Sequence, residues 1–136
     1  MANALFDAGR AGFLGADIDW DANNIKLVCV DHTDDTPNVS TDDFLDDITA
    51  PARVATSGNF ANKTKTAGVA DADDITLTSV TGDQFESLVI YNDSPATEAG
   101  KHLIAYIDTA TGLPCTPNGG NINIVFDSGA NKIFKL

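Results

Sequence analysis

Two apolar runs decide the fold class of this chain: Phe85-Glu86-Ser87-Leu88-Val89-Ile90-Tyr91 and His102-Leu103-Ile104-Ala105-Tyr106-Ile107-Asp108. Both are rich in Val, Ile and Tyr, which favour β-strands. The segment between them, residues 92–101, contains the Pro, Gly and Asn that end strands. We therefore expect an antiparallel hairpin. Apolar residues occupy odd and even positions of each run, which predicts that both faces of the hairpin are covered.

The residues outside this hairpin add further short strands and two short helices. A helix is expected over residues 5–15, although its three glycines weaken it and make it depend on packing against the sheet or another subunit. A second helix is expected over residues 41–48, stopped by Pro51. Alternating or apolar patterns predict strands at the following ranges: 24–32, 53–57, 75–80, 121–127 and 132–136. The spacing of the last two predicts that they pair with each other.

These elements predict an all-β protein, an antiparallel β-sandwich with one or two short helices. The strand count is about seven or eight, the spacing is irregular, and no βαβ alternation occurs. A jelly roll is the specific expectation. The length of 136 residues predicts one domain, spanning residues 1–136.

The chain is strongly acidic, with a net charge of −12 from 20 acidic and 8 basic side chains. Such a surface repels phosphate backbones and anionic lipids, so neither direct nucleic-acid binding nor membrane binding is expected. No signal peptide and no membrane span is predicted. Residues 31–47 hold seven aspartates and no basic residue. We expect this acidic edge to be a solvated surface, with docking on a basic partner as the alternative.

The sequence contains no specific catalytic or metal-binding pattern. Residues 17–21 begin like a calcium loop, but Ala22 stands where a glycine is required and Val28 where a glutamate is required, so a turn is expected. His32 is expected to be a solvated loop histidine, and Cys29 a small core residue. No nucleophile elbow, phosphate loop or dinucleotide fingerprint occurs. We therefore predict no catalytic, cofactor-binding or metal-binding residue, no cofactor and no enzyme activity.

Several stretches together resemble a known family. They are Phe6-Asp7-x-Gly9-Arg10-x-Gly12-Phe13-Leu14, Asp17-Ile18-Asp19-Trp20-Asp21, Val69-Ala70-Asp71-Ala72-Asp73-Asp74, Ile104-Ala105-Tyr106-Ile107-Asp108-Thr109-Ala110-Thr111-Gly112-Leu113-Pro114 and Gly129-Ala130-Asn131-Lys132-Ile133-Phe134-Lys135-Leu136. The chain resembles, over nearly its whole length, the small structural proteins of tailed phages and prophages, and among them the capsid cement (decoration) proteins. These motifs carry no known chemistry.

The resemblance implies a jelly-roll-like protein, dimeric, made in the cytoplasm of the host bacterium and bound to the outer surface of the virion. Its partners would be the phage major capsid protein and a second copy of itself. A two-fold dimer would present one patch to two capsomers, so modest contacts would add through effective concentration. No residue can be carried over from the family as functional, because its motifs have no assigned site.

Candidate contact residues with the capsid or a second subunit lie in the N-terminal segment and in the acidic edge: Phe6, Phe13, Leu14, Trp20, Asp42, Asp43, Asp46 and Asp47. For Phe6, Phe13 and Trp20, ordinary core packing explains the residues as well. The alternatives to a cement protein are a tail or fibre component of the virion and a carbohydrate-binding sandwich. The latter stacks exposed aromatics on sugar rings, and this chain has one Trp and two Tyr, with both tyrosines in apolar runs.

Overall fold

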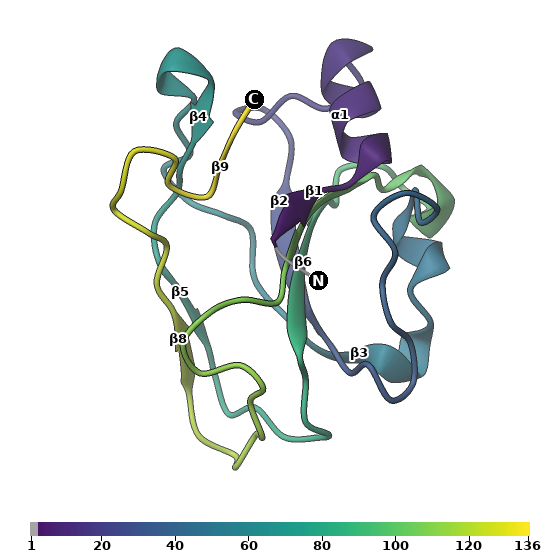
Figure 1. The fold of residues 1–136 in the computed structure, drawn as a ribbon, viewed down its shortest axis with the longest axis vertical. Coiled ribbons are helices and arrows are strands. Elements are labelled where there is room, and N and C mark those ends of the chain that lie inside the picture. Colours follow the sequence, from purple (N-terminus) through teal and green to yellow (C-terminus); the bar gives the residue numbers. More distant parts are fainter. Residues whose placement is uncertain (1–2) are drawn as a thin grey trace.

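A five-stranded antiparallel sheet forms the centre of the protein (Figure 1). The computed structural model describes residues 3–136. The strand order is β1-β7-β6-β2-β3. The bounds are β1 (Ala4–Leu5), β2 (Ile25–Val30), β3 (Arg53–Thr56), β6 (Ser87–Asn92) and β7 (Leu103–Ile107). Strands β6 and β7 pair antiparallel, with Leu88 opposite Ile107, so the hairpin prediction is confirmed.

Two short ribbons complete the strands. Strand β4 (Val69–Ala70) pairs with β9 (Phe134–Lys135), and β5 (Ile75–Leu77) pairs with β8 (Ile122–Ile124). The predicted hairpin between residues 121–127 and 132–136 is therefore wrong. The reason is packing: the ring of Phe134 lies 5.3 Å from that of Trp20, a contact that holds β9 beside β4 rather than beside β8.

The sheet is covered on both faces, as the apolar runs predicted. Figure 1 shows the two ribbons on one side of the sheet and residues 31–52 on the other. All six residues of β6 are buried. Ile25, Leu27 and Ile90 belong to the core under the ribbons, whereas Val28 and Val89 belong to the core under residues 31–52. Successive side chains along each strand point to opposite faces of the sheet, so each strand contributes to two separate cores.

The protein is all-β and sandwich-like, as predicted, but the jelly-roll prediction is not confirmed. A jelly roll has eight strands in two Greek keys. Residues 3–136 instead form one five-stranded sheet and two two-stranded ribbons.

The N-terminal helix prediction is confirmed by α1 (Asp7–Leu14), which ends at Gly15. The helix packs on β7 so closely that a Cβ added at Gly9 would lie 2.7 Å from the Leu103 carbonyl oxygen. Glycine is thus required at this position for the helix to reach the sheet. Within residues 3–136, no helix has the length and hydrophobicity to cross a bilayer.

The prediction of a helix over residues 41–48 is wrong. Only a 3₁₀ turn, η1 (Leu45–Asp47), forms there, and Phe44 is extended and makes an isolated bridge with His102. The carboxylate of Asp47 accepts hydrogen bonds from the backbone N–H groups of Asp43 and Phe44 at 2.8 and 3.1 Å. The Leu45 N–H, which a helix from Thr41 would bond to the Thr41 carbonyl, donates instead to the Lys101 carbonyl at 3.0 Å. Three further 3₁₀ turns are η2 (Ala50–Ala52), η3 (Thr66–Gly68) and η4 (Glu98–Gly100).

Candidate functional site

Two of the predicted contact residues are core residues. Phe6 is fully buried and packs edge-on against Tyr106, with ring centroids 6.5 Å apart. Trp20 is 5% exposed and packs edge-on against Phe60 and Phe134. Neither ring is exposed enough to touch a partner directly. For both residues, ordinary core packing is therefore what the structure shows.

The C-terminal end of α1, in contrast, exposes apolar surface. Leu14 is 90% exposed, the largest value among the exposed large hydrophobic residues. Phe13 is half-buried, and its ring lies 5.9 Å from that of Phe134. Across from α1, Leu136 follows β9 and is 58% exposed. Leu136 was not among the candidates named from the sequence, because only the fold brings it near the N-terminal helix.

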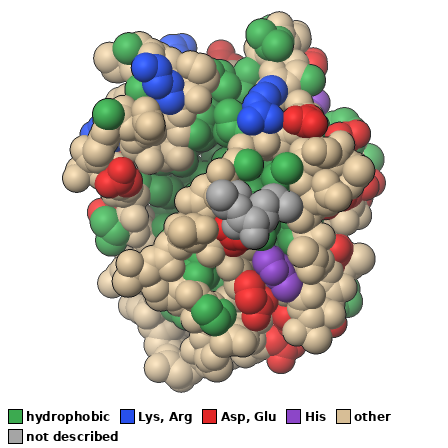
Figure 2. Space-filling model, in the orientation of Figure 1, with side chains coloured by type: hydrophobic (Ala, Val, Ile, Leu, Met, Phe, Trp, Pro, Cys, Tyr) green, Lys and Arg blue, Asp and Glu red, His purple; other side chains and the backbone are tan. Residues whose placement is uncertain are grey.

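These side chains border a groove, which we call the α1–β9 groove. Its volume is about 410 Å³, and its lining consists of Leu5, Arg10, Phe13, Leu14, Lys135 and Leu136. A second hollow of about 420 Å³ shares Phe13 and Leu136 with it and extends toward Trp20 and Ala70. Figure 2 shows hydrophobic side chains gathered between the two upper lobes of the molecule, with Lys and Arg side chains on either side.

The charge at the α1–β9 groove is opposite in sign to that of the whole chain. Its charged lining residues are Arg10 and Lys135, with no acidic residue among them. Arg10 forms an exposed ion pair with Asp7, 2.9 Å between Nη1 and Oδ1. Lys135 has no ion pair within residues 3–136. In a protein of net charge −12, this groove therefore carries an unneutralised cation.

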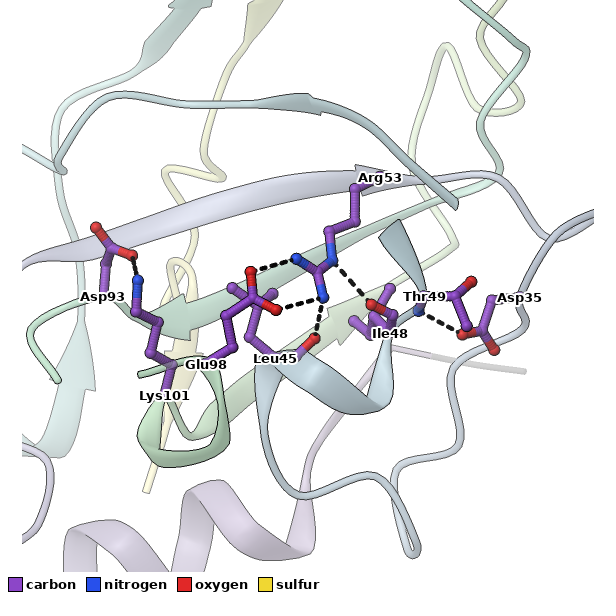
Figure 3. A network of polar contacts seen from close by, with 8 residues as sticks. All are labelled: Asp35, Leu45, Ile48, Thr49, Arg53, Asp93, Glu98 and Lys101. Atoms are coloured by element: carbon purple, nitrogen blue, oxygen red, sulfur yellow. Dashed lines mark hydrogen bonds and ion pairs between the residues drawn. The ribbon is translucent and has the colours of Figure 1, made fainter. Parts of the chain in front are cut away.

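Arg53 holds one end of the acidic edge in place through hydrogen bonds and an ion pair (Figure 3). Its Nε donates to the Ile48 carbonyl at 2.8 Å, and its Nη2 donates to the Leu45 carbonyl at 2.7 Å. Nη1 and Nη2 also donate to the two carboxylate oxygens of Glu98, at 2.8 and 3.1 Å. The hydrogen bond from Arg53 lowers the pKa of Glu98. One arginine thus fixes η1 against η4 through bidentate and backbone contacts.

The four predicted aspartates of this edge divide into two kinds. Asp42 and Asp47 accept backbone hydrogen bonds, Asp42 from the N–H of Asn38 at 2.7 Å, and so hold the turn. Partial burial raises the pKa of Asp42. Asp43 and Asp46 are exposed, and their carboxylates contact no donor in the described part of the chain. Asp43 and Asp46 are thus the free charges that a basic partner would meet.

A further acidic cluster joins Asp31 and Asp34 to Asp83, whose carboxylate oxygens lie within 4.8 Å of one another. Asp31 is buried and accepts a hydrogen bond from the Thr33 N–H at 2.7 Å. Three single oxygens fall short of the six to eight that calcium takes. The cluster concentrates negative charge, and the sequence could not indicate it because Asp83 is distant along the chain.

His32 is not the solvated loop histidine that was predicted. Its Nε2 lies 2.8 Å from the Ser87 hydroxyl, and its ring stacks on that of Tyr106 with centroids 6.2 Å apart. The Glu86 carboxylate accepts the His32 backbone N–H at 2.8 Å. A serine–histidine contact can activate a nucleophile, but Ser87 is fully buried, so a substrate cannot reach it. The contact ties the loop after β2 to β6.

Comparison of the chain with protein-family models and with curated proteins finds no match. Among the features described, the α1–β9 groove combines exposed apolar side chains, a hollow and an unpaired charge, which are the properties of a surface that binds another molecule.

Proposed function

We propose that this protein is a non-enzymatic capsid cement (decoration) protein of a tailed phage. It binds the outside of the head and bridges neighbouring capsomers of the major capsid protein. One observation carries the proposal. The two family-like stretches at opposite ends of the chain, residues 6–14 and 129–136, supply most of the lining of the α1–β9 groove. Residues of two further family-like stretches, Trp20 and Ala70, line the hollow beside it.

This convergence supports the proposal because a family of binding proteins shares its contact surface as well as its core. The four stretches are separated in sequence, and α1 and the β4–β9 ribbon bring them to one corner of the molecule. A shared motif that only filled the core would not leave Leu14 90% exposed and Leu136 58% exposed. Large exposed apolar side chains that gather in one place mark interaction sites.

A cement protein stabilises an assembled shell by mass action. A ligand that binds only the closed lattice stabilises the lattice by its binding free energy. A homodimer would double each contact across two capsomers. The strongly acidic remainder of the surface keeps the protein from DNA and anionic lipids. The protein would be made in the host cytoplasm and end on the outer surface of the virion.

The alternatives are a tail or fibre component of the virion and a carbohydrate-binding module. The side chains of the Trp and the two Tyr argue against carbohydrate binding, because Trp20, Tyr91 and Tyr106 are each 5% exposed or less. Such buried rings cannot stack on a sugar. A tail component shares the proposed contact chemistry and differs in copy number.

The test is cryo-EM of the intact particle, with the copy number measured by gel densitometry against the major capsid protein. The cement proposal expects roughly one copy per capsid protein subunit or per small group of subunits, with density bridging capsomers. A few copies confined to the tail would refute it in favour of the tail alternative. Light scattering of the purified protein tests the dimer.

A further inference from the structure

We infer that the α1–β9 groove binds its partner by β-strand addition: an extended segment with apolar and acidic side chains lies between β1 and β9 and pairs with both. The identity of that partner, the capsid shell, rests on the proposed function. The mode of binding rests on the two strand edges that border the groove.

The first open edge belongs to β1, the outermost strand of the five-stranded sheet. β1 pairs with β7, Leu5 opposite Ala105, and the Phe6 N–H donates to the Ile104 carbonyl at 2.9 Å. Backbone groups of an antiparallel strand point alternately to either side. Because the backbone N–H of Phe6 points toward β7, the N–H and C=O of Leu5 point to the other side. No strand pairs with β1 on that side in the described chain.

The second open edge belongs to β9. Its partner is β4, and the Leu136 N–H donates to the Gly68 carbonyl at 3.0 Å. By the same alternation, the N–H and C=O of Lys135 point away from β4. The ribbon has two strands only, so this edge is unpaired within residues 3–136. Leu5 and Lys135 both line the α1–β9 groove. In Figure 1, β9 lies between β4 and the β1–α1 segment.

An exposed strand edge presents unpaired N–H and C=O groups and is a template for pairing with another chain. In strand addition the backbone hydrogen bonds give affinity, while pockets for alternate side chains give specificity. Here the apolar side chains of Leu5, Phe13 and Leu14 offer contacts for one face of the added strand. The addition would join the sheet to the β4–β9 ribbon.

The charge at the groove selects the composition of the added segment. Arg10 and Lys135 are the charged lining residues, and Lys135 has no partner carboxylate among the described residues. A second copy presenting this same face would set cation against cation across a two-fold axis. A segment with carboxylates beside its apolar residues is attracted instead. We therefore assign the groove to the shell partner and not to the dimer contact.

The test measures the binding of purified protein to phage heads that lack it, for three forms: the unmodified chain, Leu14→Glu and Val125→Glu. Val125 is the matched control, because it is also an exposed apolar residue, 73% exposed, and it lies outside the groove. We expect Leu14→Glu to bind roughly tenfold to a hundredfold more weakly, since the complex loses the leucine side chain that binding would bury and gains a charge there. Val125→Glu is expected to bind like the unmodified chain.

Hydrogen exchange read by mass spectrometry on the head-bound and free protein tests the strand itself. The Leu5 and Lys135 amides have no ladder partner, so they should exchange quickly in the free protein and at least tenfold more slowly on the head. Equal exchange in both states refutes strand addition, even where Leu14→Glu weakens binding.

The remaining outcomes separate this inference from the proposed function. If Leu14→Glu and Val125→Glu both bind as the unmodified chain does, the groove is not the contact and the cement function stands. If Leu14→Glu instead converts a dimer to a monomer in light scattering, the groove is the subunit contact and the inference is refuted. If the unmodified chain binds no heads, the proposed function fails and the assignment of the partner fails with it.

Discussion

Replacing Gly9 by alanine should destabilise the protein, although alanine is the better helix former. The added methyl carbon would lie 2.7 Å from the Leu103 carbonyl oxygen and 2.9 Å from the Ile104 Cα. Both are backbone atoms of β7 and cannot rotate away. Overpacking of this kind costs about 1–3 kcal/mol, and the upper end applies to a rigid neighbour. Helix propensity returns about 1 kcal/mol. The expected net loss is therefore about 2 kcal/mol.

Thermal unfolding followed by circular dichroism measures this loss. For a chain of 136 residues, a loss of 2 kcal/mol lowers Tm by about 7 °C. The matched control is Gly58→Ala, because a Cβ there would meet no atom within 4 Å. That substitution should leave the free energy of unfolding unchanged or raise it by about 0.4–1 kcal/mol through the unfolded chain. A Gly9→Ala protein as stable as the unmodified chain would refute the close packing of α1 on β7.

Three further predictions concern carboxylates and thiols. Asp47→Ala should lower the free energy of unfolding in urea by about 1 kcal/mol, because two backbone N–H groups lose their acceptor. Asp43→Ala should change the free energy of unfolding by less than about 0.5 kcal/mol. Equal losses for the two variants would contradict the assignment of Asp47 to the turn and of Asp43 to the free surface. Burial would raise the pKa of Asp93, but Lys101 and Lys26 outweigh it and lower the pKa below 3.8. The Asp93 carboxylate therefore contributes to stability above pH 3.8, and this contribution is lost as the pH falls below that value. Asp93→Asn should remove this acid sensitivity from unfolding curves and should lower the free energy of unfolding by about 2 kcal/mol at pH 7. Burial raises the pKa of Cys29 to about 12, so a thiol reagent at pH 8 should leave Cys29 unmodified in the native protein and react with it only after unfolding, while Cys115 reacts in both states.

The elements that the sequence predicted correctly are those whose patterns are local and strong. The runs that became β2, β6 and β7 are rich in Val, Ile and Leu. For β6 and β7, burial on both faces followed from apolar residues at odd and even positions. The helix α1 and its close packing on the sheet were also predictable, since the predicted range 5–15 holds three glycines and such a helix requires support. These features arise within a few residues of one another.

The features that the sequence did not predict depend on partners distant along the chain. The end of the chain pairs with β4 because Phe134 packs on Trp20, which no spacing rule contains. The 41–48 segment has a helical pattern, yet the Leu45 N–H, which such a helix would use, donates to the Lys101 carbonyl. Of the exposed leucines that line the α1–β9 groove, Leu14 could be named from the sequence and Leu136 could not. A candidate surface made of both chain ends emerges only when the fold is known.

The pairing of β2 with β6 also sets a schedule for folding during synthesis. Ile25 lies opposite Asn92, and Val30 lies opposite Ser87, so β2 leaves the ribosome long before its central partner exists. At about 5–20 residues per second, the interval between the two strands lasts about 3 to 13 s. During that time β3 can pair with one edge of β2, but the other edge of this strand of five apolar residues and one lysine has no partner. Aspartates on either side of it, such as Asp21 and Asp31, act as gatekeepers against aggregation. The acidic composition thus protects the nascent chain before it has a surface to present.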